Sequence, residues 1–365
     1  RKLYNFALYL IPQLLLSSSV AFSQDTKLLN IYNWSDYINP SVVDAFEKEY
    51  GIKVNYDIYD TSEIVDTKLL AGRSGYDVVF HGASFASRLL AIGVFQPLDK
   101  SKLSNWGNLD PIKLEAIEEF DPGNRFGMPY MWGTTGVTYN ADMIEARLPN
   151  APVDSYDLIF DPAVISKFSD CGVSFLDDPT SVVPMGMIYL GHPFNSVEPE
   201  HLEAVEELFT AVRPYIKYFS SSKLTIDLPS REVCIAMSWS GDYAVAITRA
   251  REVGIDLNLK YAIPAEGGIG WYDMVFIPAD ASHSDNAHLF LNYLLRPNVI
   301  ATVTNYIGYA NANQAANPLI IPEYYSDVAI YPDDETFQSL EITHILEPTL
   351  ERRRSRTWTR IKSGL

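Results

Sequence analysis

Short apolar segments alternate with amphipathic segments along the first third of the chain, and this alternation restricts the fold more than any other feature. Strands are predicted at 28–32, 52–58 and 76–80, and helices at 40–50, 62–71 and 85–92. Repeated strand–helix–strand alternation is typical of a mostly parallel sheet with helices on its faces. We therefore predict an α/β fold, with about the first 110 residues in one domain.

A second α/β unit follows, and the length of 365 residues suits two domains. Two glycine-rich segments, 126–137 and 266–273, are predicted to cross between the domains, with Gly133 and Gly136 as a hinge. The predicted first domain holds residues 27–134 and 273–312, and the predicted second domain holds residues 137–270 and 313–365.

The first 23 residues are interpreted as a secretory signal peptide. A basic start precedes a mostly apolar stretch, and small residues at 21–23 suit cleavage by a signal peptidase. Polar interruptions argue against a membrane helix in this stretch. Export favours a disulfide between the two cysteines, Cys171 and Cys234, with two buried thiols as the alternative.

The formal charge of −18 restricts the possible partners. An acidic protein is repelled by nucleic acid and by anionic membrane surfaces, so we expect neither as a partner. A cationic ligand is compatible with this charge. Aromatic residues make up 13% of the chain, which suits a binding site with aromatic walls or simply an aromatic-rich core.

Acidic residues recur just beyond predicted strands or glycine-rich turns, mostly beside a tryptophan. The positions are Trp34/Asp36, Asp178, Trp239/Asp242 and Trp271/Asp273, and Tyr37 and Tyr309 lie in similar segments. Ligands of open α/β sheets bind at the carboxyl ends of strands. Each aspartate alone could instead be a helix cap, since Asp is a preferred N-cap. Of the neighbours Asp177 and Asp178, we assign the capping role to Asp177.

Several carboxylates in one site repel one another and resist desolvation, so they need a positive partner. A hard metal ion would take oxygen ligands without aromatic faces, and cysteine and histidine show no metal-binding spacing. Tryptophan faces favour organic cations, with about 0.5–2 kcal/mol per contact. We therefore predict a ligand that carries ammonium groups, with no metal and no cofactor.

The chain resembles the periplasmic polyamine-binding proteins, the soluble receptors of spermidine/putrescine ABC importers. The resemblance covers nearly all of the chain after residue 27, and its most specific segments are 31–37, 129–136, 171–177, 294–297 and 309–313. Trp-Ser-Asp-Tyr at 34–37 and the cysteine pair point to the putrescine-type branch. The resemblance implies a two-domain, periplasmic-binding-protein-like (type II) α/β fold with a ligand cleft between the domains.

The resemblance also implies roles for individual residues. Trp34, Trp239 and Trp271 match aromatic walls, and Asp242 and Asp273 match the carboxylates that hold ammonium groups. The remaining expected contacts are Ser35, Asp36, Tyr37, Ser84 and Tyr309.

Three positions depart from the putrescine-type pattern. Asp178 stands where spermidine-type proteins carry a carboxylate and putrescine-type proteins a small residue, so it is an additional expected ligand contact. Ser181 replaces a glutamate of both branches, and Gly82 replaces a serine. The preferred amine is therefore left open.

The predicted function is a periplasmic receptor, expected to be a monomer without catalytic residues, that binds putrescine or a related di- or triamine. It would deliver this polyamine to the membrane permease subunits of an ABC importer. One alternative is a periplasmic polyamine sensor that docks on a signalling protein. A remote alternative is an exported hydrolase using His81 and Ser84, although the second glycine of a nucleophile elbow is missing.

The basic run at 352–356 is expected to be a solvated helix face.

Overall fold

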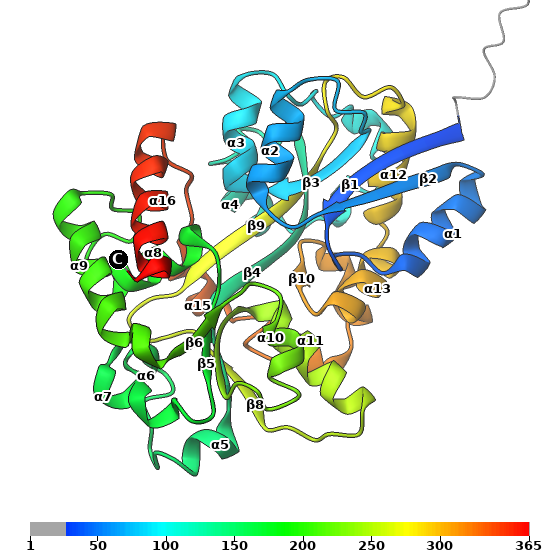
Figure 1. Cartoon of the computed structure of the whole chain (residues 1–365). Coiled ribbons are helices and arrows are strands. Elements are labelled where there is room, and N and C mark those ends of the chain that lie inside the picture. The colour runs from blue at the N-terminus through cyan, green and yellow to red at the C-terminus, as the bar shows by residue number, and fades with distance from the viewer. Residues whose placement is uncertain (1–26, 365) are drawn as a thin grey trace, which may run out of the picture.

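The structure is a computed structural model that describes residues 27–364, apart from the side chain of Asp334. The predicted signal peptide at 1–23 lies outside the described residues. The described chain folds into two lobes that are joined by strands running from one lobe into the other (Figure 1). None of the helices between residues 27 and 364 has the length and apolar character that a membrane span requires.

The described strands belong to one curled sheet. They are β1 (Leu28–Trp34), β2 (Lys53–Tyr59), β3 (Val78–Gly82), β4 (Gly127–Asn140), β5 (Val173–Phe175), β6 (Ile216–Phe219), β7 (Ile235–Trp239), β8 (Leu259–Ala262), β9 (Ile269–Phe276), β10 (Ala310–Asn311) and β11 (Glu341–Ile342). Their main order is β2-β1-β3-β9-β4-β7-β5-β6. β1 is parallel to β2 and β3, and β5 is parallel to β6 and β7, as the alternation predicts for each lobe.

Helices cover the sheet in both lobes (Figure 1). The upper lobe of that view contains α1 (Pro40–Tyr50), α2 (Ser62–Leu70), α3 (Ala83–Ala91), α4 (Pro111–Ile117), α12 (Ser284–Leu294) and α13 (Pro297–Ile307). The other lobe contains α5 (Ala141–Glu145), α6 (Asp157–Phe160), α7 (Pro162–Ile165), α8 (Pro179–Tyr189), α9 (Pro199–Val212), α10 (Leu224–Asp227), α11 (Ser240–Glu252) and α16 (Pro348–Ser363). The short helices α14 (Pro322–Tyr325) and α15 (Asp334–Gln338) lie between α13 and α16 in the chain.

Local sequence signals set both ends of α1. The Asn39 side chain accepts a hydrogen bond from the Ser41 amide at 3.0 Å, and Pro40 occupies the first helical position. Gly51 adopts the left-handed conformation with φ +63° and ends the helix. The helix predicted at 40–50 is confirmed.

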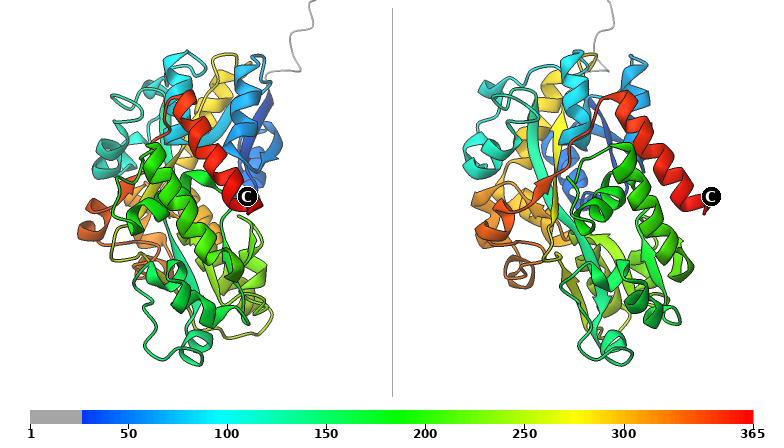
Figure 2. Two further views of the ribbon diagram at one scale, coloured as in Figure 1. Left: turned by 60° about the vertical axis from the view of Figure 1, so that its left-hand side comes forward. Right: turned by 90° about the vertical axis from the view of Figure 1, so that its left-hand side faces the viewer.

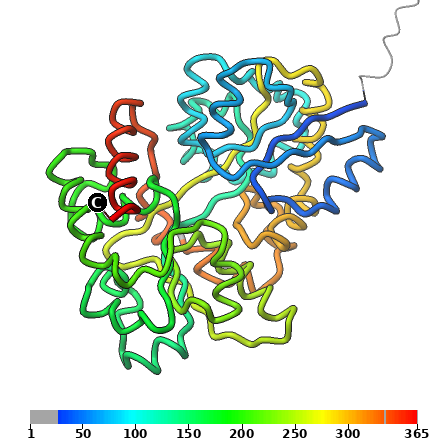
Figure 3. Tube along the Cα trace, in the orientation of Figure 1, coloured from blue at the N-terminus to red at the C-terminus, as the bar shows by residue number. Residues whose placement is uncertain are grey.

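Two antiparallel strands, β4 and β9, connect the lobes (Figure 3). β4 continues through both glycines of the predicted hinge, and β9 begins at Ile269, so the segment predicted as a glycine-rich crossing is largely strand. A Cβ at Gly133 would lie 2.6 Å from the Trp271 ring, and a Cβ at Gly136 would lie 2.3 Å from the Ala262 carbonyl oxygen. Close packing therefore requires both glycines, while their role as a hinge stays a prediction.

Each lobe has its own hydrophobic core. Buried phenylalanines at 46, 80 and 290 belong to the first core, and those at 160, 175 and 209 belong to the second. Core membership changes between Trp132 and Val137 on β4 and between Ile269 and Tyr272 on β9.

The domain boundaries drawn from the sequence stay a prediction. The residues of the two hydrophobic cores give evidence on the boundary predicted after residue 312. Ala316, Ile320 and Ile330 pack in the first core, although the segment after 312 was assigned to the second domain. We propose that the first domain extends at least to Tyr324, since Ala329 is the first later residue that packs in the second core.

Cys171 and Cys234 form a disulfide, as predicted, with their Cα atoms 5.5 Å apart. The two residues lie shortly before β5 and β7, which are adjacent parallel strands, so the sheet itself brings them together. Both cysteines are buried in the core of the second lobe.

The C-terminal basic run is not a solvated face at every position. Figure 2 shows α16 lying along the helices of the second lobe, and it packs against α8 and α9. Arg354 is only 1% exposed, its Nη2 donates to Asn195 Oδ1 at 3.3 Å, and burial lowers its pKa. The prediction of a solvated face is wrong for Arg354, because α16 is docked on the lobe at this point.

Removal of the disulfide is expected to destabilise the protein. The bridge joins residues separated by 63 positions, and restricting so long a loop in the unfolded chain is worth about 4 kcal/mol. Urea denaturation should show a free energy of unfolding lower by about this amount for the double variant C171S/C234S. Chemically reduced wild-type protein serves as the control and should match the variant. Equal values for the oxidised wild type and the variant would contradict this account.

Candidate functional site

Two carboxyl groups from different parts of the chain are held by two tyrosines whose rings touch. The Tyr309 hydroxyl donates to Asp242 Oδ1 at 3.2 Å, and the Tyr37 hydroxyl donates to Asp273 Oδ2 at 2.7 Å. The two tyrosine rings meet edge to face with centroids 5.5 Å apart. Asp242 comes from α11 of the second lobe, whereas Asp273 lies on β9 beside β3 of the first lobe. The tyrosine pair therefore joins acids drawn from both lobes.

The two carboxyl groups have no salt-bridge partner in the described part of the chain, although the more distant Arg249 lowers the pKa of Asp242 slightly. Each aspartate keeps some exposed surface but is surrounded by protein atoms, and desolvation raises the pKa of both to about 7 against the downward effect of the tyrosine hydrogen bonds. Among residues 27–364, no lysine or arginine forms a salt bridge with either carboxyl group. Asp242 Oδ2 is buried and has no described hydrogen-bond partner. A ligand with two positive charges would supply what this arrangement lacks.

Asp242 lies in a helix rather than in a loop. α11 begins at Ser240, so Asp242 stands in the first turn, where the helix dipole favours a negative charge. A Cβ at Gly241 would lie 2.2 Å from the Tyr309 ring. Only glycine at this position allows Tyr309 to approach the helix and reach Asp242.

The three predicted tryptophans have different neighbours in the fold. Trp271 meets Tyr309 with ring centroids 5.3 Å apart, and its indole N–H is buried without a described partner. Trp34 ends β1 and packs on Tyr59 with centroids 4.4 Å apart, and its indole N–H is also buried without a described partner. Trp239 is half-buried at the end of β7 and packs against both cores.

Asp178, and not Asp177, caps helix α8. Asp178 Oδ1 accepts from the Thr180 amide at 2.9 Å and from the Thr180 hydroxyl at 2.7 Å, and Oδ2 accepts from the Ser181 hydroxyl at 2.5 Å. Asp177 Oδ1 instead accepts from the Trp358 indole and from Lys362 on α16. The assignment of the cap to Asp177 is wrong, because the helix begins at Pro179 and needs its cap one residue later.

The remaining predicted residues have no described contact with the two central acids. The Ser35 hydroxyl donates to Asp60 at 2.6 Å, and Asp36 is exposed in a turn with φ +54°. Ser84 lies in the first turn of α3, which begins directly after the end of β3. Contacts thus unite Tyr37, Asp242, Trp271, Asp273 and Tyr309, and these five form the central cluster.

Two tyrosines that the sequence reading missed support the central cluster. The Tyr59 ring packs against the Trp34 ring, and the Tyr130 hydroxyl donates to the Tyr37 carbonyl at 2.8 Å. The pKa of each is raised well above its ordinary value, mainly by burial, with a contribution from the charge of Asp273. Tyr59 could have been found from the parallel register, which places it beside Trp34 at the ends of β2 and β1.

The histidine considered for a hydrolase is engaged elsewhere. His81 is fully buried in β3, with Nε2 2.8 Å from Asp66 Oδ1, and Asp66 also accepts from Arg88 at 2.6 Å. No hydrogen bond between His81 and Ser84 is found in the described part of the chain. The pair therefore does not have the geometry of a nucleophile and its base.

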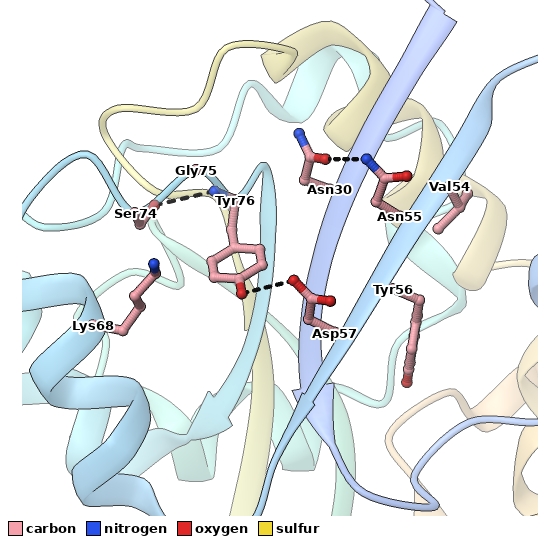
Figure 4. A pocket seen from close by; sticks show the side chains of 9 residues that line it. All are labelled: Asn30, Val54, Asn55, Tyr56, Asp57, Lys68, Ser74, Gly75 and Tyr76. Atoms are coloured by element: carbon pink, nitrogen blue, oxygen red, sulfur yellow. Dashed lines mark hydrogen bonds between the residues drawn. The ribbon is translucent and has the colours of Figure 1, made fainter.

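A polar hollow of about 620 Å³ opens on the first lobe and contains none of the predicted site residues (Figure 4). Its side chains already bond to one another: the Tyr76 hydroxyl donates to Asp57 at 2.9 Å and the Asn55 amide to Asn30 at 2.9 Å. Because these groups satisfy one another, we place the candidate site at the central cluster and not in this hollow.

Comparison with known proteins decides the family. A family model described as bacterial extracellular solute-binding protein matches residues 41–332. The chain belongs to this family. The putrescine-binding periplasmic protein SpuD of Pseudomonas aeruginosa is 46% identical over 95% of this chain and 95% of its own length. The putrescine-binding periplasmic protein PotF of Escherichia coli is 46% identical over 97% of each.

The solved structures agree with this assignment. The spermidine/putrescine ABC transporter substrate-binding protein PotD of Streptococcus pneumoniae is similar with a TM-score of 0.77 at 29% identity, over 92% of this chain and 99% of that chain. The predicted two-domain α/β binding-protein fold of type II is confirmed, and so is the resemblance to periplasmic polyamine-binding proteins.

The stability of the ligand-free protein is expected to depend on pH through the two central acids. Aspartate in an unfolded chain has a pKa of about 3.9, whereas Asp242 and Asp273 have a pKa of about 7. The folded state therefore binds more protons between these values, so this stabilisation is complete below about pH 4 and is lost as pH rises through about 7. Asp242→Asn, which mimics the neutral acid, should melt above the wild type by a margin that grows from about pH 4 to about pH 7 and then levels off.

Thermal melts of the ligand-free proteins across this range measure the margin. Asp44→Asn, on the exposed side of α1, is the matched control and should show no such growth. A margin for Asp242→Asn that stays constant with pH would refute the role of this carboxyl group.

Proposed function

We propose that this protein is a periplasmic receptor that captures a polyamine between its lobes and delivers it to the permease subunits of an ABC importer. The observation that carries the proposal is the pair of carboxyl groups, one from each side of the molecule, that lie in an aromatic surrounding without a described salt-bridge partner. The periplasmic relatives, whose names include putrescine-binding and spermidine/putrescine-binding protein, support the same ligand class.

A diamine suits this pair for electrostatic reasons. Its two ammonium groups carry the charge that Asp242 and Asp273 need, and its methylenes can lie along aromatic rings. Binding would exchange neutral acids for two ion pairs in a partly desolvated site, where Coulomb attraction is stronger than in water. Trp271 and Tyr309 touch each other within the central cluster and are the proposed walls closest to the acids.

The outer residues complete the proposed site. Trp34 and Trp239 would cover the methylenes, and Ser35, Asp36 and Ser84 would line the first-lobe side. Asp178 stays a proposed contact, although both of its oxygens already accept hydrogen bonds in the first turn of α8. We propose that the receptor acts as a monomer and performs no catalysis.

The proposed partner of the receptor is the permease of an ABC importer, and the alternative partner is a signalling protein. A sensor that docks on a signalling protein would use the same ligand site, so the site does not separate the two roles. The family consists of solute-binding proteins, and relatives matching over nearly the whole chain are periplasmic binding proteins, which favours transport.

Calorimetry with putrescine, cadaverine and spermidine tests the proposal. We expect at least one of these amines to bind the wild-type protein, and Asp242→Asn to weaken that binding at least about tenfold, because one ammonium group loses its charged partner. Asp44→Asn should bind like the wild type. Absence of binding by every amine would overturn the receptor assignment, whereas unchanged affinity in Asp242→Asn would remove Asp242 from the site.

A further inference from the structure

The strand β4 changes its neighbours at the predicted hinge. On one edge it pairs with β10, which packs in the first core, as far as Trp132, and with β7, which packs in the second core, from Thr135 onward. Gly133 and Thr134 stand between these two pairings. No described strand pairs with β4 at these two positions on this edge, so the Thr134 amide needs an acceptor from elsewhere.

A side chain from α11 supplies that acceptor. The Thr134 amide donates to Ser240 Oγ at 3.3 Å, and both residues are buried. Ser240 is the first residue of α11 and directly follows β7. A Cβ at Gly133 would lie 2.9 Å from Ser240 Oγ, so glycine leaves the room for this approach. The Ser240 hydroxyl therefore fills the gap between the two strand pairings of β4.

The same helix carries one of the two central acids. Asp242 lies two residues after Ser240 in the first turn of α11, and its carboxyl group accepts from Tyr309, which packs in the first core. Thr134 is also held from the second lobe, since its Oγ1 lies 2.8 Å from the Tyr261 hydroxyl on β8. A helical turn has a fixed backbone geometry. A displacement of Asp242 therefore displaces Ser240 and changes its hydrogen bond to Thr134.

Within the proposed function, we infer that Ser240 is a positioning residue that couples polyamine capture at Asp242 to the predicted hinge in β4. In the described arrangement the lobes touch through Tyr309, and the Ser240 hydroxyl holds the Thr134 amide. Bending β4 to part the lobes would break this hydrogen bond and leave a buried amide without its acceptor, which is costly. A ligand that fixes Asp242 also fixes the first turn of α11, and so stabilises the same hydrogen bond.

This coupling is expected to act on ligand release rather than on ligand encounter. The hydrogen bond belongs to the arrangement with the lobes in contact, and a neutral hydrogen bond changes an equilibrium by a factor of about three to ten. The ligand enters while the lobes are apart and this bond is absent. Loss of the Ser240 hydroxyl should therefore speed dissociation and leave association nearly unchanged.

Stopped-flow tryptophan fluorescence with putrescine, cadaverine and spermidine tests this inference. For an amine that binds, Ser240→Ala should raise the dissociation rate constant about three- to tenfold and change the association rate constant less than about twofold. Ser238→Ala is the matched control. The Ser238 hydroxyl lies 2.6 Å from Thr138 Oγ1 and is as buried as that of Ser240, but it stands within the β4–β7 pairing and not in the gap. It should leave both rate constants within about twofold of the wild type.

A second variant keeps the test independent of how Ser240→Ala folds. Tyr261→Phe removes the other hydrogen bond that holds Thr134 and is also expected to speed release. Urea denaturation of the ligand-free proteins should show similar losses of stability for Ser240→Ala and Ser238→Ala, because each loses one buried hydrogen bond. Unchanged release in Ser240→Ala and Tyr261→Phe, or equally fast release in Ser238→Ala, would overturn the coupling and leave the receptor intact. Absence of binding by every amine in the wild type would overturn the proposed function as well.

Discussion

The desolvation of two carboxyl groups without a counter-ion is the constraint on which the rest of this structure depends. Isolated charges are costly to bury, and Asp242 and Asp273 respond with a pKa of about 7. Tyr37 and Tyr309 donate one hydrogen bond to each acid, which satisfies part of its bonding capacity but adds no charge. The surroundings are therefore polar enough to keep the acids in place and too weakly charged to ionise them fully near neutrality.

Much of the fold follows from local sequence signals. Asn39, Pro40 and Gly51 specify both ends of α1, and the alternation of strands and helices predicts the parallel sheet of each lobe. The disulfide follows from export and from the presence of only two cysteines. These signals are short-range or compositional, so they can be read without knowing the tertiary structure.

The errors arise where tertiary packing decides the outcome. The strand β9 starts before Trp271 because β4 pairs with it, although a glycine-rich crossing is predicted there. Asp177 and Asp178 are indistinguishable by type, and only the exact start of α8 assigns the cap. The burial of Arg354 depends on how α16 docks on its lobe. The types of the site residues could be predicted from the sequence, whereas the pairing of each acid with its tyrosine could not.

The contact between α11 and the end of α13 makes the ionisation of Asp242 depend on the relative position of the lobes. Gly241 lies against the Tyr309 ring, and a Cβ at Gly308 would lie 2.5 Å from the Ala244 Cβ, so the two segments touch through small residues. Separating the lobes at this contact would pull Tyr309 from Asp242 and admit water to the acid, which then ionises at its ordinary pKa. With the lobes in contact and no ligand bound, the two acids are about half protonated near pH 7, and their ionisation above neutral pH works against this contact until a dication neutralises them.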